Sequence, residues 1–120
     1  MNVKPAIAQR LEGRVAIVTG GGGDPSIGRA ICLRFAEEGA KVGILDVDLS
    51  GAESAVAEIE AGGGVATARR CDVTDAAAVK TAVDSIAAAW GGRVDILVNC
   101  AAWYKGMGGF RPFDEWTEEQ

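Results

Sequence analysis

Residues 14–28 read RVAIVTGGGGDPSIG, and this stretch decides the fold that the sequence predicts. Its first six residues form a short, mainly apolar run, which is typical of a β-strand buried on both faces of a sheet. Glycines occupy positions 20–23, and from Ser26 onward the apolar residues recur with a helical period. The stretch therefore predicts a buried strand, a glycine-rich turn and a helix that begins near Ser26.

The rest of the chain repeats this alternation of short apolar runs and amphipathic helical segments. Further strands are expected at residues 41–46, 65–73 and 94–98. Strands that alternate with helices form right-handed βαβ units and a parallel sheet with helices on both faces. We therefore expect an α/β protein, a Rossmann-type doubly wound parallel sheet with strand order 3-2-1-4. The switch point of such a sheet, here between the first and fourth strands, is where ligands bind.

The helical segments carry their own start signals. The first helix is expected from Ser26 to Glu38, and Gly39 is placed to end it. Ser50 or an earlier aspartate is expected to cap the second helix, and Asp75 the third. The apolar face of the first helix is expected to hold four residues: Ile27, Ala30, Ile31 and Phe35.

Length and charge limit the class of protein. The 120 residues are 48% hydrophobic, which suits one small core, so residues 1–120 are expected to form one incomplete domain. The net charge is -5 and no basic run occurs, which disfavours nucleic acid and membrane surfaces as partners. The three cysteines lack CxxC spacing, which predicts reduced thiols in a cytoplasmic protein. The chain has no histidine, so no metal site is expected.

The glycine-rich turn is a candidate phosphate site because it lies between a buried strand and a helix. Glycines let the backbone approach a pyrophosphate, and the helix N-terminus offers unpaired N–H groups and a positive dipole end. Ser26 can cap the helix or turn its hydroxyl toward a phosphate. The candidate residues are Gly20, Gly21, Ser26, Ile27 and Gly28. The competing interpretation is a turn without a ligand.

Asp46 ends the second expected strand, where a carboxylate can accept hydrogen bonds from both ribose hydroxyls of an adenosine. The same carboxylate would repel a 2′-phosphate, and no Arg or Lys directly follows it. At about 4 Å and an effective dielectric constant near 20, two unit charges interact by roughly 4 kcal/mol. Asp46 therefore favours NAD over NADP, unless it is simply an aspartate that starts a loop.

With these features in order, the chain resembles the short-chain dehydrogenase/reductase family. The family pattern TGxxxGxG is matched by Thr19, Gly20 and Gly28, although the spacing is two residues longer and Ser26 replaces the middle glycine. This longer form is similar to the loop of enoyl-reductase-like members. The resemblance implies binding of a nicotinamide dinucleotide, and it covers the chain from Gly13 onward.

Two further segments match family motifs. Asp72 and Val73 resemble the Asp-Val pair in which the aspartate contacts the adenine amino group, although they also fit a strand end that runs into a helix cap. Asn99, Cys100 and Ala101 resemble the NNAG motif, with Cys100 in place of the second asparagine. The resemblance therefore adds Asp72, Val73, Asn99 and Ala101 to the candidate cofactor-binding residues. Cys100 is interpreted as a packed thiol.

The catalytic residues of the family are not found in this chain. The family uses a YxxxK pair, in which the lysine lowers the pKa of the tyrosine. Tyr104 is the only tyrosine, Gly108 stands four residues later, and Lys105 has the wrong spacing. Tyr104 is therefore expected to pack in a loop or line a substrate pocket together with Trp103. Family members are about twice this length, so we expect an inactive, truncated N-terminal part.

The sequence supports three hypotheses for the full-length protein. The first is an oxidoreductase that transfers a hydride between a nicotinamide cofactor and a carbonyl or alcohol. The second is an enoyl reductase, and the third is a dinucleotide-binding module without catalysis. The expected partners are a small-molecule substrate and, by resemblance to the family, further copies of the same chain.

Overall fold

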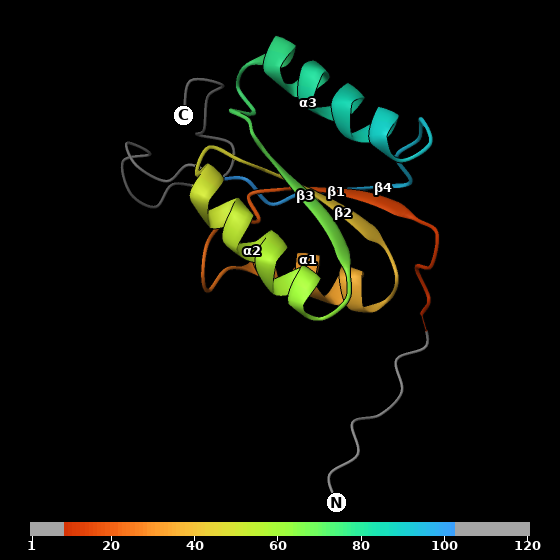
Figure 1. Ribbon diagram of the computed structural model, residues 1–120. Coiled ribbons are helices and arrows are strands. Elements are labelled where there is room, and N and C mark those ends of the chain that lie inside the picture. The colour runs from red at the N-terminus through yellow and green to blue at the C-terminus, as the bar shows by residue number, and fades with distance from the viewer. Residues whose placement is uncertain (1–8, 103–120) are drawn as a thin grey trace, which may run out of the picture.

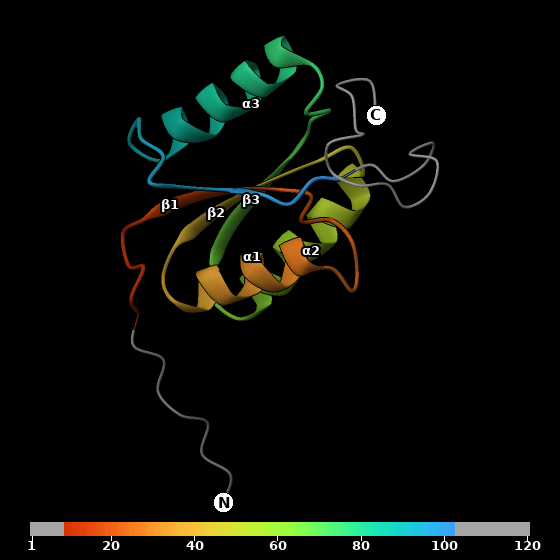
Figure 2. The same cartoon turned by 180° about the vertical axis from the view of Figure 1, so that it is seen from behind.

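The computed structural model describes residues 9–102, and they form a parallel sheet covered by helices on both faces. The strands are β1 (Val15–Thr19), β2 (Lys41–Asp46), β3 (Val65–Arg70) and β4 (Ile96–Asn99), in the spatial order β3-β2-β1-β4. Helices α1 (Ile27–Glu37) and α2 (Leu49–Ala61) cover one face, and α3 (Ala76–Ala89) covers the other (Figures 1 and 2). The predicted fold class and strand order are confirmed.

The sheet has two apolar faces, and each is packed against helices. Alternate residues of β1 and β2, such as Val18 and Ile44, pack in a cluster with α1 and α2. The residues between them, such as Ile17 and Leu45, pack in a second cluster with α3. This burial on both faces explains why these strands read as nearly continuous apolar runs in the sequence.

A polar side chain caps the start of each helix. Ser26 Oγ accepts a hydrogen bond from Arg29 N–H at 3.1 Å, as predicted for α1. Asp75 caps α3 in the same way, also as predicted. For α2 the sequence left two candidates open, and the cap is Asp48, which accepts from Gly51 N–H at 3.1 Å. Ser50 lies inside the first turn and donates its hydroxyl to Asp48.

The predicted apolar face of α1 is wrong in part. Ile31 and Phe35 pack against the core, but Ala30 is exposed and Ile27 is 77% exposed. The buried residues of α1 are Gly28, Arg29 and Cys32. The rotation of the helix is set by the close approach of Gly28 to the turn after β1, which a periodicity of apolar residues cannot reveal.

The strand ends differ from the predicted ones by a few residues. β3 ends at Arg70 instead of residue 73, because the chain then turns at Asp72, whose carboxylate accepts from Thr74 N–H. β4 begins at Ile96 instead of residue 94. Assignment of all 120 residues to one domain stays a prediction. Trp103, Tyr104 and Lys105 lie outside the described residues, as does the rest of the chain that follows them.

Candidate dinucleotide-binding site

The predicted site residues follow the carboxyl ends of the strands, and these ends meet at one edge of the sheet. In the parallel register, Thr19 of β1 lies between Leu45 of β2 and Asn99 of β4. The glycine-rich turn after β1 and residues 100–102 after β4 both leave the sheet there, at the switch point between two adjacent strands. Figure 1 shows that the connections before α1 and α2 lie at this same edge.

Gly20 brings the turn after β1 into contact with the residues that follow β4. Its φ is +76°, and an added Cβ would lie 2.7 Å from the Cα of Ala101 and 2.8 Å from the carbonyl carbon of Cys100. These are backbone atoms, so a side chain could be accommodated only if one of the two segments moved. Glycine is therefore required both by the left-handed conformation and by the close contact.

Thr19, which was not among the predicted site residues, holds the same two segments together. Its buried hydroxyl oxygen accepts hydrogen bonds from Cys100 N–H at 3.2 Å and Ala101 N–H at 3.1 Å. The signals available in the sequence were its match to the first position of the TGxxxGxG pattern and its place at the end of β1. Thr19 thus positions the segment that contains the candidate residue Ala101.

The amino end of α1 packs closely on the glycine-rich turn. A Cβ at Gly28 would lie 2.4 Å from the carbonyl oxygen of Gly20, so only glycine allows this approach. Ser26 accepts from Arg29 N–H and donates its hydroxyl to Gly23 O at 3.1 Å, so it acts as a cap within the turn. The N–H groups of the first helical turn have no acceptor within a helix. Those of Ile27 and Gly28 therefore suit an anion at this helix end.

Asp46 joins the glycine-rich turn to the second strand. Its Oδ2 accepts from Gly22 N–H at 2.8 Å, and its Oδ1 accepts from Asp48 N–H at 3.0 Å. The glycine-rich turn and the Asp46 carboxylate are therefore neighbours, as expected for two parts of one binding site. A carboxylate offers about four lone-pair sites, so each oxygen can still accept a further hydrogen bond from a ribose hydroxyl.

Residues 71–74 continue the site beyond β3. Cys71 N–H donates to the carbonyl oxygen of Asp46 at 3.1 Å, which keeps this segment beside β2. Asp72 accepts from the hydroxyl of Thr74 at 2.7 Å and from its N–H at 2.9 Å. These hydrogen bonds lower the pKa of the Asp72 carboxyl below its usual value. Asp72 is therefore ionised at neutral pH. The side chain of the next residue, Val73, is exposed.

The cysteines near this edge are suited to packing. All three are free thiols. Burial raises the pKa of the Cys32 thiol to about 12, and the neighbouring Cys100 adds to this effect. Burial also raises the pKa of Cys71, with smaller contributions from Asp72 and Asp75. Cys32 and Cys71 therefore stay protonated at neutral pH, which is unfavourable for nucleophilic attack or metal binding.

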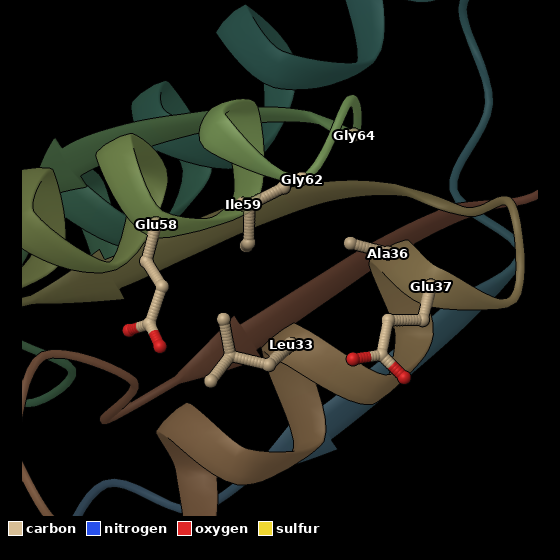
Figure 3. Close-up of a pocket in the computed structure, with 7 residues that line it drawn as sticks. All are labelled: Leu33, Ala36, Glu37, Glu58, Ile59, Gly62 and Gly64. Carbon is tan, nitrogen blue, oxygen red and sulfur yellow. The ribbon is translucent and has the colours of Figure 1, made fainter. Parts of the chain in front are cut away.

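A cavity of about 150 Å³ lies between α1 and α2, but at the other end of these helices (Figure 3). Both helices begin at the edge that carries the glycine-rich turn, and the cavity is lined by their C-terminal halves and by glycines that follow α2. Its volume is below the roughly 300–1,000 Å³ of most small-molecule sites. The cavity therefore does not belong to the candidate dinucleotide site. Its lining residues are Leu33, Ala36, Glu37, Glu58, Ile59, Gly62 and Gly64.

Residues 9–102 contain neither a cluster of metal ligands nor a membrane-spanning helix. No three His, Cys, Asp or Glu side chains of this segment are grouped as a metal site would need. None of its helices has the length and apolar character required to cross a bilayer.

Comparison with known proteins identifies the family. Residues 14–120 match the family model for short chain dehydrogenases. The chain belongs to the short-chain dehydrogenase family. This short-chain dehydrogenase chain is 44% identical over 92 residues to a D-threitol dehydrogenase of Mycolicibacterium smegmatis, covering 77% of this chain and 34% of that protein. It is 43% identical over 105 residues to a 7alpha-hydroxysteroid dehydrogenase of Escherichia coli, covering 88% and 38%.

Solved structures of two dehydrogenases resemble this chain in their fold. A dehydrogenase/reductase from Sinorhizobium meliloti has a TM-score of 0.77 and 39% identity, with 95% of this chain and 43% of that chain covered. The hydroxysteroid dehydrogenase from Escherichia coli has a TM-score of 0.76 and 39% identity, with 92% and 44% covered. The resemblance inferred from the motifs is therefore confirmed. The chain spans about a third of the length of the curated relatives it matches.

Proposed function

We propose that this chain is the cofactor-binding part of an NAD(P)-dependent oxidoreductase that transfers a hydride between nicotinamide and a carbonyl or alcohol. The observation that carries the proposal is the 2.8 Å hydrogen bond between Asp46 and Gly22 N–H. It joins a turn suited to a diphosphate to a carboxylate suited to a ribose. Membership of the short-chain dehydrogenase family supports the same reaction class.

The residues present fit such a cofactor. In the glycine-rich turn, the backbone of Gly20 packs directly against Gly28 at the start of α1, and no side chain lies between them. In our proposal, the first-turn N–H groups of α1 bind the diphosphate and Asp46 binds the ribose of the adenosine. Asp72 and Val73 bind the adenine, and Asn99 and Ala101 adjoin the second ribose. The bound cofactor supplies the hydride chemistry, while this part of the chain binds and orients it.

We propose that Asp46 makes NAD the preferred cofactor. A 2′-phosphate would meet the carboxylate with a repulsion of roughly 4 kcal/mol at about 4 Å and an effective dielectric constant near 20. Isothermal titration of the full-length polypeptide with NADH and NADPH tests this. Tighter binding of NADH is expected, whereas much tighter binding of NADPH would refute the role of Asp46. Failure of both to bind would refute the cofactor site itself.

The relatives' names support a dehydrogenase over the two alternatives. Both relatives described above are dehydrogenases by name, whereas the longer turn with Ser26 was the only feature in favour of an enoyl reductase. We propose no catalytic residue within residues 1–120, and we expect this chain alone to be inactive with NAD and simple alcohols. Turnover by the purified chain would refute that expectation. Action on a small molecule, self-association and a cytoplasmic location are also proposals, based on the family and the cysteine pattern.

A further inference from the structure

Arg70 lies beside Asp46 at the edge of the sheet, although the two residues belong to different strands. They are register partners in the parallel pair of β2 and β3. Neighbouring strands are about 4.8 Å apart, so the two side chains start from adjacent points. The neighbouring pair Ile44 and Ala68 packs on the face covered by α1 and α2. Because side chains alternate along a strand, Asp46 and Arg70 point to that face as well.

Arg70 is an exposed cation at this edge. Within residues 9–102 its guanidinium forms no ion pair and no side-chain hydrogen bond. By contrast, Arg29 in the first turn of α1 is buried and bound to Glu58 at 3.0 Å. Arg69 points to the opposite face, where its guanidinium donates to Thr67 Oγ1 and to the carbonyl of Ala68.

We propose that Arg70 is a second determinant of cofactor choice, which binds a phosphate on the 2′-oxygen of the adenosine. This inference rests on the proposed function, in which Asp46 binds that ribose. A phosphate on the ribose would lie between the carboxylate that repels it and the long side chain of the adjacent arginine. Guanidinium binds phosphate through paired hydrogen bonds. Arg70 therefore offsets part of the repulsion from Asp46, and the site discriminates against NADPH less strongly than Asp46 alone would.

The experiment measures dissociation constants for NADH and NADPH on the full-length polypeptide. Adenosine 5′-monophosphate and adenosine 2′,5′-bisphosphate serve as probes that lack nicotinamide. Arg70→Gln removes the charge and nearly keeps the volume, Arg70→Lys keeps a charge, and Arg69→Gln is the matched control on the other face. Circular dichroism spectra establish that each variant is folded.

Arg70→Gln is expected to weaken binding of NADPH and of the bisphosphate about tenfold, the size of one charged hydrogen bond at an exposed site. Binding of NADH and of the monophosphate should change less than about twofold. Arg69→Gln should leave the affinity ratio of NADPH to NADH, and that of the bisphosphate to the monophosphate, unchanged. In an Asp46→Asn background NADPH should bind more tightly than in the wild type, and Arg70→Gln should reduce NADPH affinity there by about the same tenfold factor.

An unchanged ratio of NADPH to NADH affinity in Arg70→Gln would overturn the role of Arg70 while leaving the cofactor site intact. Equal losses for NADH and NADPH would overturn it too, since they would indicate a general effect on the site. Absence of binding by all four nucleotides to the wild type would refute the proposed function, and this inference with it.

Discussion

Replacing Gly51 with alanine should destabilise this protein, although the same change inside most helices is stabilising. Gly51 lies in the first turn of α2, after the cap Asp48. A Cβ at this position would lie 2.3 Å from the carbonyl oxygen of Gly22 and 3.1 Å from its carbonyl carbon. Gly22 belongs to the glycine-rich turn, and its N–H donates to Asp46. The substitution therefore forces α2 and the turn apart.

The two contributions to stability have opposite signs. Alanine is favoured over glycine in a helix by about 0.5–1 kcal/mol. Overpacking costs about 1–3 kcal/mol. The upper value applies here because the contacted atom is a backbone carbonyl oxygen, which cannot rotate away as a side chain can. The net expectation is a loss of about 2 kcal/mol in the free energy of unfolding. Displacement of Gly22 should also weaken NADH binding, because the Asp46 carboxylate would lose its N–H donor.

Urea unfolding of the full-length polypeptide, followed by circular dichroism, measures the change in stability. Gly62→Ala is the matched control, because a Cβ there would meet only ordinary contacts of 3.5 Å or more. That variant should be unchanged or up to about 1 kcal/mol more stable. If Gly51→Ala is as stable as the wild type, or more stable, the packing argument for this edge of the sheet is wrong.

Three further predictions concern other residues. Thr19→Val should cost about 1–3 kcal/mol in thermal unfolding, because Ala101 N–H loses its hydroxyl acceptor and Cys100 N–H keeps only the carbonyl oxygen of residue 19. Thr19→Ser should retain most of the stability. The N–H of Val15, together with Arg93 and Arg14, lowers the pKa of the Asp95 carboxyl in the folded state. The ionised carboxyl therefore stabilises the fold at pH values above its unfolded pKa near 3.8, and this stabilisation is lost as the pH falls through the lower folded pKa. The stability difference between wild type and Asp95→Asn should therefore shrink in urea titrations below about pH 4, and a constant difference would contradict this. With a pKa of about 12, Cys32 should resist iodoacetamide at pH 8 in the native protein and react after unfolding in urea; rapid native labelling, seen by mass spectrometry, would count against it.

The fold could be predicted because each of its features leaves a local trace. The apolar run of β1 and the glycines after it identify a buried strand and a turn. Ser26 and Asp75 identify helix starts, since a cap acts on the N–H groups of its own first turn. Alternation of strands and helices then leads to the order β3-β2-β1-β4, because parallel crossovers are nearly always right-handed.

The contacts between segments could not be predicted in the same way. Periodicity placed Ile27 on the buried face of α1, but the contact of Gly28 with Gly20 turns it outward. The contacts of Thr19 with Ala101 and of Gly51 with Gly22 were not predicted, because the partners are distant in the sequence. Arg70 was not weighed against Asp46 because only strand pairing makes them neighbours.

The sequence by itself determined the order of elements, the caps of α1 and α3, and the choice of candidate binding residues, including Asp46. Each of these depends on residue type and short-range spacing, which are written along the chain. Only the tertiary structure shows that Asp46 holds the glycine-rich turn through the N–H of Gly22 and that Arg70 lies beside Asp46 on the neighbouring strand. Such contacts depend on strand register and on close packing, in which a shift of a few tenths of an ångström makes or breaks a contact. A linear pattern of apolar and polar residues contains no measure of either.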